Sequence, residues 1–158
     1  MPAATVSSLP VDPAAIALLP GCDFADTFAV TVPQAVEAPA VAAMAFATPP
    51  DWVSALMGVR NAVMGRLGYK TAKLRMGFPV LSSAPDQVLM GLDDGHLDFR
   101  AVVRVERAAH GESRITLTTL VKRHNTLGRV YLGVIMPFHK LIVRSMLARL
   151  AARLHNGG

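Results

Sequence analysis

Residues 91–100, with the sequence GLDDGHLDFR, bring carboxylates, an imidazole and a guanidinium close together. His96 and Asp98 have the chemistry of an acid–base pair, because a neighbouring carboxylate favours the protonated imidazole. A single histidine with one or two carboxylates leaves a metal ion incompletely coordinated, so no metal site is predicted. Ion pairs across the strands of a hairpin are common near turns. The stretch is therefore interpreted as a hairpin end with a hydrated face, and His96 and Asp98 are weak catalytic candidates.

His139 is the second residue whose surroundings could support chemistry. It falls on the apolar side of a predicted helix, where a histidine is more often a core residue with one hydrogen bond. If a cavity adjoins that helix, the imidazole becomes the natural polar contact for a bound molecule. We therefore treat His139 as a ligand-binding candidate and a weak catalytic candidate. The other predicted ligand contacts are Arg60, Phe99, Tyr131, Ile142 and Met146.

Motifs that would name a reaction are missing from the sequence. It contains no nucleophile elbow, glycine-rich phosphate loop, zinc-ligand spacing or dinucleotide fingerprint. The single Cys22 excludes an internal disulfide and a site built from several cysteines. No cofactor is expected, and an enzyme is less favoured than a binding protein because no nucleophile and base can be paired.

Composition and charge narrow the class of protein. Hydrophobic residues make up 52% of the 158 residues and charged residues 17%, which indicates a single folded domain with an apolar excess that could line a cavity. After Glu112 there is no acidic residue, and half of the basic residues lie there. Nucleic acid is not an expected partner because aromatic residues for stacking are scarce. An anionic membrane surface is a less favoured alternative. The N-terminus lacks a basic n-region, which predicts a cytoplasmic protein.

The N-terminal half predicts one strand and three helices. Asp12 and Pro13 begin a short helix that ends at Pro20 and Gly21, and the residues before it are expected to form a loose tail. Residues 22–30 form a predicted strand, and residues 38–47 a helix. A third helix is predicted from Thr48 to Leu67. Its apolar face consists of Trp52, Leu56, Val59, Val63 and Leu67.

Beyond Gly77 the sequence alternates with a period of two, which predicts an antiparallel meander. Residues 78–83 (FPVLSS) form a strand that Pro79 places at an edge, where a homodimer could pair. A two-residue turn at Asp94 and Gly95 would pair Leu92 with Leu97 and place apolar side chains on one face. A further strand carries Ile115, Leu117, Thr119 and Val121 on one face.

The last segment returns to helical spacing from a cap at Asn125 or Thr126, and Pro137 is expected to kink the helix. Its predicted apolar face contains Ile142, Val143, Met146, Leu147, Leu150 and Leu154. Lys140, Arg144 and Ala148 are expected on the opposite side.

The order of these elements is similar to the α+β helix-grip architecture of the START-like (SRPBCC-type) superfamily. Three stretches, DWVSALMGVRN, GLDDGHLDFR and HNTLGRVYLGVIMPFHKLIVRSML, also resemble a bacterial domain-of-unknown-function family that occurs alone and attached to short-chain-dehydrogenase-like proteins. The resemblance implies a curled antiparallel sheet around the last helix, with residues 21–155 as one domain after an N-terminal segment 1–20. It implies no catalytic residue.

The favoured hypothesis is binding of a small apolar or amphipathic molecule between the sheet and the last helix. The alternatives are an enzyme of the cyclase or hydrolase type that uses His139 or the His96 and Asp98 pair, and a basic module that docks on an anionic membrane or an acidic partner.

Overall fold

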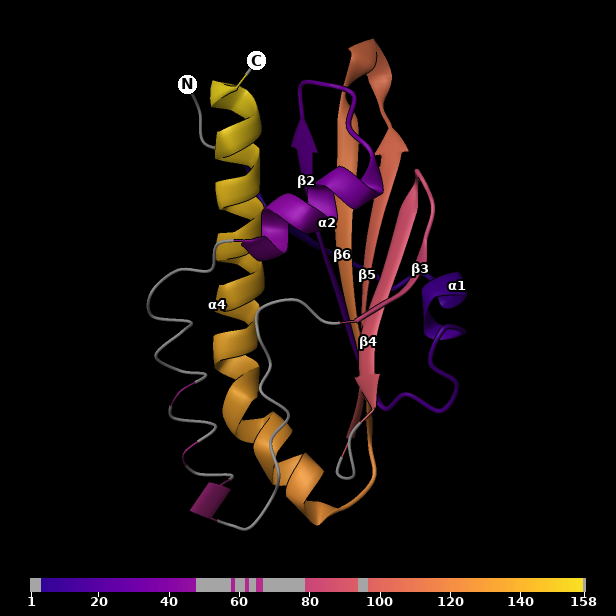
Figure 1. The fold of residues 1–158 in the computed structure, drawn as a ribbon, viewed down its shortest axis with the longest axis vertical. Helices are drawn as coiled ribbons and strands as arrows, with labels where there is room; N and C mark the ends of the chain where they lie inside the picture. Colours follow the sequence, from indigo (N-terminus) through magenta and orange to yellow (C-terminus); the bar gives the residue numbers. More distant parts are fainter. Residues whose placement is uncertain are drawn as a thin grey trace.

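The computed structural model describes residues 4–47, 58, 62, 65–66, 79–93 and 97–157. Its centre is a six-stranded antiparallel sheet in the order β1-β2-β6-β5-β4-β3. The elements are β1 (Ser7–Leu9), α1 (Pro13–Ile16), β2 (Phe24–Val32), α2 (Ala38–Ala47), β3 (Val80–Ser83), β4 (Gln87–Asp93), β5 (Leu97–Arg107), η1 (Ala109–Gly111), β6 (Ser113–Arg123) and α4 (Thr126–Asn156). Figure 1 shows α2 and α4 on one face of the sheet, here called the inner face, and α1 beside the other, the outer face. This α+β arrangement confirms the predicted class and is consistent with a helix-grip fold.

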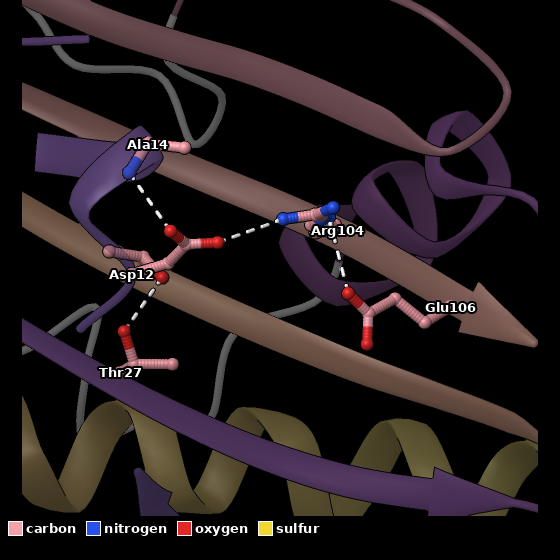
Figure 2. Close-up of polar contacts among 6 residues, drawn as sticks. Asp12, Ala14, Thr27, Arg104 and Glu106 are labelled. Carbon is pink, nitrogen blue, oxygen red and sulfur yellow. Dashed lines mark hydrogen bonds and ion pairs between the residues drawn. The ribbon is translucent and has the colours of Figure 1, made fainter. Parts of the chain in front are cut away.

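The N-terminal residues hold α1 against the outer face. Asp12 caps α1 by accepting a hydrogen bond from the amide of Ala14 at 2.9 Å, and its other carboxylate oxygen accepts one from Arg104 on β5 at 3.1 Å (Figure 2). Beyond α1, Leu19 packs on Val102 and Leu120 in a small outer core. The predicted cap at Asp12 is confirmed. The prediction of a loose tail before this helix is wrong in part, because Ser7–Leu9 pair with β2 as an edge strand.

The hairpin of β4 and β5 has a different register from the predicted one. Leu92 pairs with Phe99 rather than with Leu97, and Asp93 pairs with Asp98 rather than with His96. The connection is longer than the two-residue turn that Asp-Gly favours. A slip of two residues keeps every side chain on its face because strands repeat every two residues. The predicted faces are therefore correct, whereas the predicted cross-strand partners are wrong.

The core lies between the inner face and the two helices. Alternate residues of the strands point inward and are almost fully buried, as are the residues that α4 contributes. Examples are Val30, Val103, Ile115, Leu147 and Leu150. Burial of Val143, Leu147, Leu150 and Leu154, with partial burial of Ile142 and Met146, confirms the predicted apolar face of the last helix.

The helix α4 begins where the sequence predicts. Asn125 accepts a hydrogen bond from the amide of Gly128 at 3.0 Å, which satisfies one of the free donors of the first turn. Pro137 lies within the helix, and the arms Thr126–Val134 and Met136–Asn156 meet at an angle of 54°, as expected for a residue that removes a helical hydrogen bond. Within the described ranges, no single helix combines the length and the apolar composition needed to cross a membrane, although the two arms together reach that threshold.

Some predicted elements cannot be compared. The helix predicted from Thr48 to Leu67 falls almost entirely outside the described residues. The edge position of the strand after Pro79 is confirmed, because β3 ends the sheet.

Candidate functional site

The inner face has a closed half and a partly open end. At the closed half, Phe28, Val30 and Ile115 are at most 2% exposed. Toward the β4–β5 connection, several residues of the same face and of the adjoining part of α4 are only half-buried, whereas Val121 and Leu132 stay buried. The open end, as we define it, consists of Phe24, Asp26, Leu92, Leu97 and Phe99 on the sheet and Met136, His139 and Ile142 on α4. Solvent therefore reaches part of the interface between sheet and helix.

An imidazole–carboxylate pair links α4 to the sheet within this open end. Nε2 of His139 lies 3.1 Å from Oδ2 and 3.3 Å from Oδ1 of Asp26 on β2. The two side chains are only 16% and 14% exposed. The ring of Phe24 meets the imidazole edge to face, with centroids 6.3 Å apart and planes at 85°. The three side chains are brought together because Phe24 and Asp26 are two positions apart on β2 and so point to the same face.

The pair uses only one of the two ring nitrogens of His139. When Asp26 is ionised it only accepts hydrogen bonds, so Nε2 of His139 must donate. In the neutral imidazole Nδ1 is then the acceptor, and no hydrogen bond to Nδ1 is present within the described part of the chain. The arrangement fixes both the tautomer and the ring orientation, as carboxylates do for functional histidines. Nδ1 can accept a hydrogen bond from a ligand or exchange a proton with it.

The structure places some of the other predicted ligand contacts near His139 and does not describe the rest. Phe99 lies on the inner face of β5, and Ile142 and Met146 lie half-buried on α4, on the side of the helix that carries His139. The structure thus brings these apolar residues to the same face as His139. Arg60 and the side chain of Tyr131 lie outside the described residues, so their part in the site stays a prediction.

The charged stretch at the β4–β5 hairpin forms a separate cluster on the outer face. Arg100 donates a hydrogen bond to Asp93 at 2.7 Å, and His124 lies 3.0 Å from Asp98. The hydrogen bond from Arg100 outweighs partial burial and holds the pKa of Asp93 below its usual value of 3.8. His96 lies outside the described residues, and Asp98 has His124 as its partner. The sheet separates this cluster from His139, so the two groups of candidates do not form one site.

The geometry of that cluster depends on Gly91. A Cβ atom there would lie 2.6 Å from Cδ of Arg100 and 2.7 Å from the carbonyl oxygen of Phe99. Glycine therefore allows the Arg100 side chain to cross β4 and reach Asp93.

A shallow hollow of about 370 Å³ lies elsewhere, where β1, β2 and β6 meet the β5–β6 loop. Its lining includes Ser7, Thr31, Glu112 and Arg114. Because it mixes charges of both signs and is widely open to solvent, it offers less to an apolar ligand than the open end of the inner face.

Sequence reasoning missed Asp26. The signal was an acidic residue between Phe24 and Phe28 on a strand whose other inward positions are apolar. A carboxylate on such a face requires a partner, because burial of an unpaired charge is costly. His139 on the apolar face of the last helix was the matching half of the pair.

Comparison with known families shows which family the chain belongs to. A family described as "Protein of unknown function (DUF2867)" matches residues 18–146. The chain belongs to the DUF2867 family. The matched region runs from the outer core to α4 and includes both Asp26 and His139. No curated protein and no solved structure matches the chain. The predicted family of unknown function is thereby confirmed, while the START-like relationship stays a prediction.

Proposed function

We propose that this DUF2867 protein binds a small apolar or amphipathic molecule at the open end of the inner face. The observation that carries the proposal is the Asp26–His139 pair, which is largely buried, leaves Nδ1 of the imidazole without a hydrogen bond among the described residues, and lies beside half-buried apolar residues. Binding sites for small molecules typically combine such surfaces with a few placed polar groups. The helix-grip arrangement expected from the sequence would supply a cavity at this position.

The residues around the pair indicate the chemistry of the ligand. Leu92, Leu97, Phe99 and Ile142 would contact an apolar body, and Met136 adds a flexible side chain that adapts to different shapes. Because Nδ1 accepts in the neutral imidazole, the polar end of the ligand should carry a donor such as a hydroxyl or amide group. Arg60 and Tyr131 are the further polar contacts that the sequence predicts.

Native mass spectrometry of the purified protein, followed by solvent extraction, tests this proposal. We expect a bound apolar or amphipathic molecule in stoichiometric amount. Replacing His139 by leucine should weaken its binding about tenfold, the effect of losing one hydrogen bond of about 1.4 kcal/mol. His155→Leu is the matched control, because His155 is exposed in the last turn of α4. If His139→Leu and His155→Leu retain the ligand equally, His139 is not part of the site. If neither the unaltered protein nor either variant retains a ligand, the result counts against the proposal.

Acid–base catalysis at the same pair is a second candidate function. A carboxylate that orients a histidine through one ring nitrogen, with the other nitrogen directed to a substrate, is the arrangement of many general bases. Turnover of a p-nitrophenyl ester should then depend on pH and disappear in His139→Gln, with Asp26→Asn reducing it less. Rates equal to those of the His155→Leu control would reject catalysis by this residue.

A further inference from the structure

One face of α4 exposes large apolar side chains to solvent. Val130, Val134, Phe138 and Leu141 are 59%, 64%, 42% and 57% exposed. Their spacing of four, four and three residues places them on one side of the helix. The buried residues Leu147 and Leu150 lie on the opposite side, toward the sheet. We call these four residues the apolar stripe.

Basic residues lie beside the C-terminal end of the apolar stripe and along α4 beyond it. At 100° and 1.5 Å per residue, Lys140 and Arg144 lie on one side of the second arm, and Arg149 and Arg153 lie on the other side, about 12 and 18 Å beyond Leu141 along the axis. All four are exposed, although the guanidinium of Arg144 lies over the ring of Phe28 on the sheet, 5.1 Å from the ring centroid. None of them forms an ion pair within the described part of the chain, and no acidic residue follows Glu112 in the sequence. The charged side chains of α4 are therefore all basic.

The bend of α4 makes the apolar stripe convex. Pro137 is exposed and lies beside the apolar stripe. A proline ring pushes the preceding turn away, so the helix bends away from the side that carries the ring. In Figure 1 the N-terminal arm bends toward the lower end of the strands, and the outer side of α4 is convex. The apolar stripe is thus a ridge rather than a groove.

We propose that α4 docks this ridge on the surface of an anionic lipid bilayer. An interfacial helix inserts its apolar face at the boundary between headgroups and acyl chains, and its flanking Lys and Arg side chains meet anionic headgroups. Charge complementarity selects this occupant, because the basic residues of α4 have no ion-pair partner among the described residues. Among the described side chains of α4, the ridge offers nucleic acid a single aromatic ring, Phe138, which gives no platform for stacking. The proposal is independent of ligand binding at His139.

Sedimentation with vesicles tests the proposal. The full-length protein is mixed with vesicles of phosphatidylcholine alone or of phosphatidylcholine with phosphatidylserine. We expect binding to the anionic vesicles only, weakened by added salt. The double variant Val134→Ser with Phe138→Ser should lower the partition coefficient at least tenfold. Lys140→Gln with Arg149→Gln should lower it about twenty-five-fold, at about fivefold per charge.

Matched controls separate the apolar stripe from general surface effects. Val80 and Leu81 on β3 are exposed apolar residues, at 60% and 51%, and their double serine variant should bind anionic vesicles as the unaltered protein does. Arg107 and Arg114 are exposed basic residues away from α4, and their double glutamine variant should lose much less affinity than the α4 variant.

Three results would overturn the proposal. The first is absence of vesicle binding, or binding that the stripe variants leave unchanged. The second is a dimer, seen by light scattering, that the Val134→Ser and Phe138→Ser substitutions dissociate without any vesicle binding, which would assign the ridge to a second copy of the chain. The third is a large loss of unfolding stability in the stripe variants without vesicle binding by the unaltered protein, which would show that the ridge is covered by another segment of the same chain.

Discussion

The Asp26–His139 pair should stabilise the fold by an amount that a double-mutant cycle can isolate. The cycle compares the unaltered protein with Asp26→Ala, His139→Ala and the double variant. Each single substitution leaves a polar group in surroundings where only about one-seventh of its surface meets solvent. An unsatisfied buried group costs about 1–3 kcal/mol, and hydrogen bonds to charged groups contribute about 1.5–3 kcal/mol. With an N–O distance of 3.1 Å, we expect a coupling energy of about 2 kcal/mol.

Urea unfolding followed by circular dichroism measures this coupling. With an m-value of about 2 kcal/mol/M, each single substitution should lower the midpoint by about 1 M. The Asp98–His124 pair is the matched control, because the same groups lie 3.0 Å apart but are 20% and 34% exposed. Its coupling should be smaller than that of Asp26 and His139, because solvent screens the more exposed His124 side chain. A coupling at Asp26 and His139 no larger than that of the control would refute the assignment of a buried, structurally engaged pair.

Three further substitutions test other parts of the structure. Gly91→Ala should destabilise the protein by about 1–3 kcal/mol in urea unfolding, because the new Cβ would contact the Phe99 carbonyl at 2.7 Å; an unchanged midpoint would contradict this packing. Arg100→Gln should raise the pKa of Asp93, measured by carboxyl NMR. Its cost to stability should be complete above the unfolded-state pKa near 3.8 and vanish as pH falls through the lower folded-state pKa; a cost that persists in acid would point to lost packing. Asn125→Ala should cost about 1 kcal/mol by removing the cap of α4, and thermal unfolding at an unchanged temperature would show that the cap contributes nothing.

Local signals in the sequence predict much of the fold. The cap at Asp12, the cap at Asn125 and the kink at Pro137 follow from side-chain chemistry within a few residues, and the structure confirms them. The alternation of apolar and polar residues predicted the two faces of β5 and β6 correctly, because successive side chains of a strand point to opposite sides of the sheet.

Pairings between distant residues could not be predicted in the same way. The register of β4 and β5 depends on the length of a connection, and the Asp-Gly sequence favoured a shorter one than the structure has. Asp26 and His139 are more than a hundred residues apart, so their contact depends on how α4 crosses β2. The sequence indicated that His139 lies on an inward face, but only the packing of α4 on the sheet supplies its partner.

The most direct test of the central claim is to locate a bound amphipathic molecule on the protein. Methyl NMR spectra recorded during titration with the fluorescent probe anilinonaphthalene sulfonate would report each position separately. We predict saturable shifts at Leu92, Met136 and Ile142, at the open end of the inner face, with little change at the fully buried Ile115 and Leu147. Shifts confined to other surfaces, or no saturable shift at the three open-end residues, would contradict a ligand site beside His139.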